Sequence, residues 1–178
     1  MLPVIEEIPE SLTVRWKVFR FINYLQVVIN AGFLALMLIA IMKTGFESSP
    51  ALSVISVLIF AFQITNNLFN IHLLNKHYPH TTLSRKKEKA GIVLLIVYIF
   101  VTIGLLIMGF SGLIDVFSDD YNHYSLSAAL SVIFFLACNL LNIYIIIEQA
   151  SLPTHIERNN KKNIQRITEE IGKPADLF

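Results

Sequence analysis

The sequence predicts an all-α, polytopic integral membrane protein with four transmembrane helices, and three observations support that fold class. Ionisable side chains are almost absent from four stretches, each about the ~20 apolar residues that the ~30 Å hydrocarbon core of a bilayer requires. Hydrophobic residues make up 54% of the 178 residues, with a mean hydropathy of +0.61, which leaves too little polar surface for a soluble globule. A short motif also recurs in two of the stretches. The expected spans are Phe21–Met42, Ala51–Leu74, Gly91–Leu113 and Leu126–Ile147.

The N-terminal segment, residues 1–20, is expected to be cytosolic and interfacial. Ser11–Arg20 combines apolar residues with three cations, and Trp16 suits an anchor at the depth of the lipid headgroups. We therefore expect a short helix at the inner membrane surface. Acidic residues precede the first span, and no small-residue cleavage site follows a short apolar core, so the first span is predicted to be an uncleaved signal anchor.

Loop charge predicts the orientation of the spans. Of the 14 Lys and Arg residues, only Lys43 lies in the loop after the first span or in the loop after the third. The others lie in the N-terminal segment, the basic loop 75–90 and the C-terminal tail, which the positive-inside rule places in the cytosol together with both termini. The acidic loop 114–125 is then external. We expect an integral protein of a bacterial inner (plasma) membrane.

The two halves of the chain share a sequence pattern. Residues 67–71 read NLFNI, and residues 139–143, displaced by 72 positions, read NLLNI. The same displacement pairs Gly32 with Gly104, Gln26 with Tyr98, and Asn30 with Thr102. We predict two duplicated helical hairpins, 21–74 and 91–147, in the same orientation and related by a pseudo-two-fold axis along the membrane normal, as in parallel-repeat transporters.

Polar residues within the spans are the candidate site. In the second span they recur at helical spacing, which places them on one face. At about 1.5 Å per residue, Asn30 and Gln63 lie roughly 14–17 Å deep, so they meet near the midplane. The remaining members belong to the cytoplasmic half. The ten candidates for binding a ligand or partner are Gln26, Asn30, Gln63, Asn66, Asn67, Asn70, Tyr98, Thr102, Asn139 and Asn142.

Two interpretations of these amides remain open. An amide facing lipid tails would leave hydrogen-bonding groups unpaired, so the polar faces must turn toward helices, water or a partner. The first function we predict is a non-enzymatic integral subunit that associates with itself, as a homo-oligomer, or with another membrane protein through the amide-lined cytoplasmic half. The alternative is a small carrier or sensor that binds a polar or zwitterionic small molecule in the same place.

Other classes of function are disfavoured by the sequence. A net charge of +1 and a pI near 7.9 argue against a nucleic-acid partner. No Gly-rich phosphate loop, GxSxG or HExxH motif is present, so we predict neither an enzyme nor a cofactor. Two weak metal candidates, the histidines 72, 77 and 80 and the loop 119–124, are interpreted as interfacial or solvated groups.

The C-terminal tail, residues 148–178, is expected to be cytosolic and amphipathic. Pro153 is predicted to interrupt a simple continuation of the fourth span. Ile164, Ile167 and Ile171 then recur at helical spacing before Gly172. So short a segment is not a stable helix alone, and we expect it to fold against the membrane, the middle loop or another subunit.

Overall fold

The computed structural model describes residues 10–44, 50–77, 85–117 and 126–172, and all of these are helical. They form α1 (Glu10–Thr44), α2 (Pro50–His77), α3 (Arg85–Phe117) and α4 (Leu126–Gly172). Pro50 fits the first turn of α2 because its fixed φ suits that position, and Gly172 closes α4 as a C-terminal glycine commonly does. Each helix contains a segment long and apolar enough to cross a membrane. The prediction of an all-α chain with four candidate spans is confirmed.

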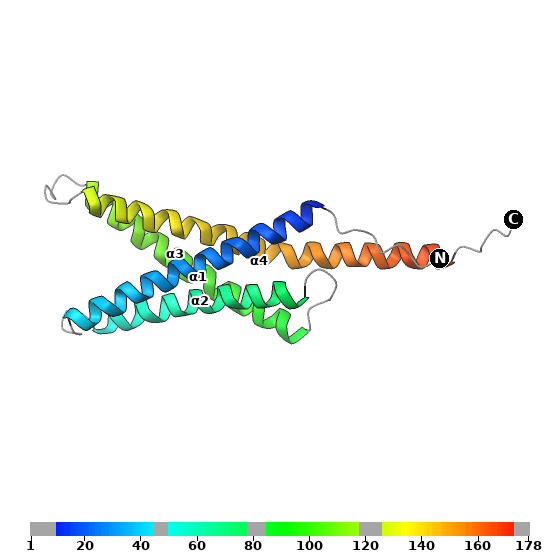
Figure 1. The fold of residues 1–178 in the computed structure, drawn as a ribbon, viewed down its shortest axis with the longest axis horizontal. Coiled ribbons are helices and arrows are strands. Elements are labelled where there is room, and N and C mark those ends of the chain that lie inside the picture. Colours follow the sequence, from blue (N-terminus) through cyan, green and yellow to red (C-terminus); the bar gives the residue numbers. More distant parts are fainter. Residues whose placement is uncertain (1–9, 45–49, 78–84, 118–125, 173–178) are drawn as a thin grey trace.

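The helices pair as two hairpins. α1 packs mainly on α2, and α3 packs mainly on α4, while the hairpins meet chiefly where α1 crosses α4 (Figure 1). We call the end of the bundle at which α1 begins the inner end, and the end at which α1 and α3 stop the outer end. In Figure 1 the two hairpins diverge toward the outer end. The predicted pairing of the first span with the second, and of the third with the fourth, is therefore confirmed.

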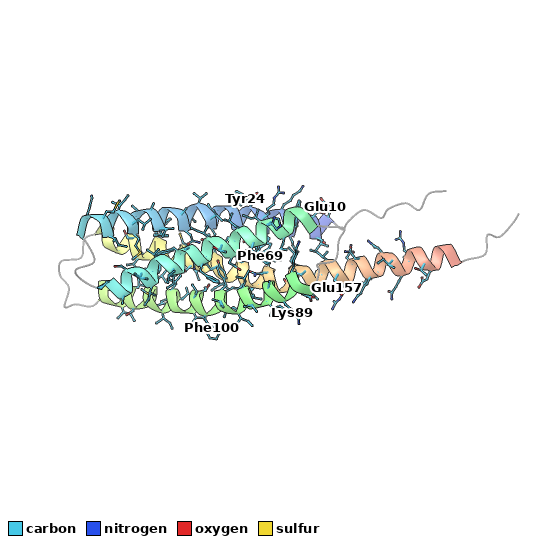
Figure 2. The ribbon with its side chains drawn as sticks, turned by 90° about the horizontal axis from the view of Figure 1, so that it is seen from below. Glu10, Tyr24, Phe69, Lys89, Phe100 and Glu157 are labelled. Atoms are coloured by element: carbon cyan, nitrogen blue, oxygen red, sulfur yellow. The ribbon has the colours of Figure 1, made fainter. Side chains whose placement is uncertain are left out.

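The bundle is polar inside and apolar outside. Most of its fully buried side chains carry amide or hydroxyl groups, whereas large apolar residues point outward, among them Val28 at 69% exposure and Phe100 at 71%. Figure 2 shows side chains along all four helices, with Tyr24, Phe69 and Phe100 labelled. In water this distribution would expose apolar surface far beyond what a soluble monomer tolerates. It fits contact with a lipid bilayer.

Both chain ends differ from the sequence-based expectation. Residues 11–20 are the first turns of α1, and residues 148–172 continue α4 without a break at Pro153, so the expected short helix at each end is corrected to one long helix. The physical reason is packing. Leu12, Phe19 and Leu152 lie in one buried cluster, and this contact holds the helix in place on the N-terminal side of Pro153. The proline still removes one backbone hydrogen bond, which a packed helix can accommodate.

The last part of α4 extends beyond the other helices (Figures 1 and 2). Here Lys161 Nζ lies 2.7 Å from Glu157 Oε1, in an ion pair between exposed side chains that are one helical turn apart. Ile164 is 63% exposed. The tail is helical as far as Gly172, and its last part projects from the bundle (Figure 1).

Two glycines of α3 provide a test of hairpin packing. A Cβ on Gly109 would lie 2.5 Å from Leu136 Cδ2 and 3.3 Å from Phe135 Cδ1, whereas a Cβ on Gly104 meets nothing within 4 Å. Gly109→Ala is therefore expected to lower the free energy of unfolding by about 1–3 kcal/mol, the usual cost of overpacking. Gly104→Ala is the control and should be neutral or stabilising, because alanine favours helix. Thermal unfolding in detergent measures both, and equal melting temperatures would contradict the prediction.

Candidate functional site

The ten predicted residues all lie inside the bundle of a single chain. Each is buried, and the most exposed of them, Asn139, retains only 4% of its accessible surface. They come from all four helices, and their amide and hydroxyl groups form a polar layer between the helices. We call these ten residues the amide layer. The polar side chains of all four spans therefore face the inside of the bundle.

Contacts between α1 and α2 set the level of each amide. The rings of Phe33 and Phe60 stack with centroids 5.6 Å apart, and Asn70 bonds to Asn23 nearer the inner end. Both contacts fit the same antiparallel alignment of α1 with α2, in which each step forward along α1 corresponds to one step back along α2. In that alignment Asn30 lies level with Gln63, and Gln26 lies level with Asn67. The predicted meeting of Asn30 and Gln63 near mid-bundle follows from this pairing.

The inner part of the layer is a closed hydrogen-bond network. Asn70 Nδ2 donates to Asn23 Oδ1 at 3.1 Å and to Gln149 Oε1 at 3.0 Å. Asn66 and Gln149 exchange two bonds, of 3.2 and 3.3 Å. Asn23 in turn donates to the carbonyl of Phe19. These bonds tie α1, α2 and α4 together, so this part of the layer acts as interhelical glue.

A second chain of bonds follows α3 and α4. Tyr98 Oη donates to Asn142 Oδ1 at 2.8 Å, Asn142 Nδ2 donates to Asn139 Oδ1 at 3.1 Å, and Asn139 Nδ2 donates to the carbonyl of Phe135 at 2.9 Å. Gln26 Nε2 donates across the hairpins to the carbonyl of Cys138 at 2.6 Å. This chain is satisfied within the protein and needs no ligand.

Four members of the layer are different, because they carry buried polar atoms without a hydrogen-bond partner. The atoms are Nδ2 of Asn30, Nε2 of Gln63, both amide atoms of Asn67, and Oγ1 of Thr102. Asn67 is 0% exposed and Gln63 and Thr102 are 1% exposed, so bulk solvent does not reach them. We call these four residues the unpaired group. Their atoms offer both donors and acceptors, and none carries a charge.

The layer has distinct boundaries at its two ends. Toward the outer end, Phe33 contacts Phe134 and Phe135 of α4 with ring centroids 6.3 and 5.9 Å away. Toward the inner end, Arg15 Nη2 donates to Glu148 Oε2 at 2.8 Å and to Ser151 Oγ at 3.1 Å. An aromatic contact and an ion pair thus enclose the neutral amides.

Sequence reasoning missed five residues at the inner end as members of the site. Asn23, Gln149 and Glu148 lie on the inward faces of α1 and α4, and Arg15 and Ser151 join the ion pair. A signal was present for two of them: Asn23 precedes Gln26 by one helical turn, and Gln149 follows Asn142 by two turns. The predicted fourth span ended at Ile147, directly before the charged Glu148. The members on α4 were therefore left out of the predicted site.

Most of the metal candidates lie outside the residues that the structure describes. His80 and the loop 119–124 lie outside the described residues. Within residues 10–44, 50–77, 85–117 and 126–172, no group of three or more His, Cys, Asp and Glu side chains could hold a metal ion.

Comparison of this chain with models of known families, with curated proteins and with solved structures gives no match. The geometry of the amide layer is therefore the basis on which a function is inferred.

Proposed function

We propose that this chain is a non-enzymatic integral membrane protein that binds an uncharged or zwitterionic polar small molecule at the unpaired group, as a small carrier or sensor. The observation that supports the proposal is the set of five buried atoms without a partner on Asn30, Gln63, Asn67 and Thr102. Each such group costs about 1–3 kcal/mol, so together they cost about as much as a typical folded protein gains, about 5–15 kcal/mol. A polar occupant would remove that cost.

The chemistry of the occupant follows from the absence of charge. Between Phe21 and Met42, and between Leu126 and Ile147, the sequence contains no Asp, Glu, Lys or Arg. An ion with net charge would lose its hydration without gaining a countercharge, whereas a neutral or zwitterionic molecule needs only donors and acceptors. Carboxamides and a hydroxyl supply both.

The proposal includes a duplicated architecture with both termini in the cytosol. Paired positions of the repeat have similar exposure: Asn67 and Asn139 are both buried, and Gly32 and Gly104 both face open space. These similarities support two hairpins related by a pseudo-two-fold axis along the membrane normal. The distribution of Lys and Arg supports a cytosolic location for both termini. We assign the protein to a bacterial inner membrane.

A second candidate is the membrane subunit, associated with itself or with another membrane protein. The last part of α4 favours it, because this segment projects beyond the other helices in Figure 1 and includes Ile164, which is 63% exposed. Association through the amide layer itself has less support. Its side chains lie between the helices of one chain, and the hairpins would have to separate before a partner could contact them.

Native mass spectrometry of the protein in nanodiscs tests the first proposal. We expect the wild-type chain to retain a stoichiometric polar small molecule, and Asn67→Leu to lose it. Thr65→Val is the matched control, since Thr65 lies on the same helix, is exposed, and bonds only to the carbonyl of Ala61; it should retain the molecule. A wild-type chain that carries only lipid would contradict the proposal. A mass equal to several chains or to a complex would favour the subunit.

A further inference from the structure

The contacts between the two hairpins are concentrated toward the inner end. The ring contacts of Phe33 with Phe134 and Phe135 are the outermost of those described above. The bond from Gln26 to Cys138, the bonds of Gln149, and the ion pair of Arg15 follow in order toward the inner end. The hairpins are therefore joined from Phe33 inward.

Toward the outer end the two hairpins separate from each other (Figure 1). α1 and α2 on one side, and α3 and α4 on the other, diverge toward the outer end in Figure 1, and Leu36, Met42, Ile107 and Ile114 are each at least 65% exposed. Packing within a hairpin continues there, because a Cβ on Gly112 would lie 3.8 Å from Val132 Cγ2. Each hairpin thus has the close packing of a rigid body, with a separation that widens outward.

The inner end is closed by a short set of contacts between α1 and α4. Arg15 Nε and Nη2 bond to the two carboxylate oxygens of Glu148 at 3.3 and 2.8 Å, and Nη2 also reaches Ser151. Leu12 and Leu152 are buried beside them. A two-point bond of guanidinium to carboxylate fixes both distance and orientation. The side chain of Arg15 is 36% exposed, so the pair lies where water can reach it.

We propose that Arg15, Glu148 and Ser151 form a latch that holds the inner end closed, and that the hairpins rotate as two rigid bodies about the contact of Phe33 with Phe135. Opening the latch would separate α1 from α4 at the inner end and bring the outer ends of the hairpins together. The released side chains of Arg15 and Glu148 become hydrated, whereas the buried contact of Leu12 with Leu152 and the bonds of Gln149 are lost, so the closed form should predominate in the wild type. The inference rests on the proposed function for its purpose, which is to control access of the polar molecule to the amide layer.

Distances between spin labels in nanodiscs test the latch without any ligand. In a Cys138→Ala background, one labelled cysteine pair replaces Val14 and Thr154 at the inner end, and another replaces Leu38 and Leu130 at the outer end; all four side chains are exposed. In Glu148→Gln we expect a longer population of the inner distance and a shorter population of the outer distance. The exchange Arg15→Glu with Glu148→Arg should restore the original distributions.

Controls separate the latch from general loosening. Glu157→Gln removes the exposed ion pair with Lys161 and should leave both distances unchanged. If Glu148→Gln fails to fold, Arg15→Lys keeps the charge, loses the two-point bond, and should show a smaller shift in the same direction. Unchanged distances in a folded latch variant, or inner opening without outer closure, would overturn the proposal. Asn67→Leu should leave both distances unaltered, so failure of the binding proposal is recognised separately.

Discussion

Replacement of Asn67 by leucine is expected to raise the free energy of unfolding in detergent, whereas the same replacement at Asn70, one helical turn away, is expected to lower it. Both side chains lie on α2 and are at most 3% exposed. They differ in their partners. Neither amide atom of Asn67 has a partner in good hydrogen-bond geometry, although the Tyr98 hydroxyl lies close to this side chain, while Asn70 Nδ2 bonds to both Asn23 and Gln149. The comparison therefore isolates hydrogen bonding from burial and helix position.

The expected magnitudes follow from the cost of unpaired polar groups. Asn67→Leu removes two such atoms, and about 1–2 kcal/mol should remain as a gain after some overpacking by the larger side chain. Asn70→Leu leaves the acceptors of Asn23 and Gln149 with fewer partners, for a loss of about 2–3 kcal/mol. Reversible unfolding of the two variants in the same micelle measures the difference. Equal losses would contradict the prediction and show that Asn67 has a partner in the purified protein, which native mass spectrometry would then identify.

The sequence predicted the amide layer because its signals are local. Charge-free stretches mark the spans through the cost of burying an ion in lipid, and the spacing of Gln63, Asn67 and Asn70 defines one face of a helix without reference to any other. A polar face in a membrane must turn inward. Each step needs only the residues of one helix, so burial of the whole layer could be predicted from the sequence alone.

The division of the layer into paired and unpaired amides could not be derived in this way. It depends on the rotation and register of helices that are distant in sequence: Gln26 bonds to a carbonyl 112 residues away, and Asn70 bonds to a side chain 79 residues away. A rotation of α2 by about 100°, the angle between consecutive helical residues, would exchange the roles of Asn66 and Asn67. The same limitation hid the ion pair, whose members are 133 residues apart.

Pro153 shows how a local rule can be overridden by packing. A proline disfavours helix in the residue before it, and the sequence alone therefore predicted a break near residue 153. In the structure, that preceding residue, Leu152, is 1% exposed and belongs to the buried cluster with Leu12. Burial of a leucine contributes about 1.5–3 kcal/mol, which is comparable with the cost of about 3 kcal/mol for an internal proline. The tertiary contact offsets the local preference.

Removal of Arg15 alone is expected to destabilise the protein more than removal of Arg15 and Glu148 together. Glu148 retains only 9% exposure of its side chain, so Arg15→Ala leaves a carboxylate that is largely buried and has lost its partner. We expect a loss of about 2–3 kcal/mol, below the range for a fully buried pair because Arg15 is partly solvated. Replacing both residues by methionine should cost less than 1 kcal/mol, since apolar groups of similar size often substitute well for a buried pair.

A double-mutant cycle in detergent measures this coupling directly. The free energies of unfolding of Arg15→Ala, Glu148→Ala and the double variant should give a favourable interaction of about 1.5–3 kcal/mol, as expected for a charge-assisted bond. The cycle for Lys161 and Glu157, whose side chains are 72% and 52% exposed, should give no more than about 0.5 kcal/mol. A coupling at Arg15 as small as that of the exposed pair would mean that Glu148 is hydrated in the folded protein. The contact could then not hold the hairpins together, because water would replace it at no cost, and the closed inner end would have to depend on Leu12 and Leu152 alone.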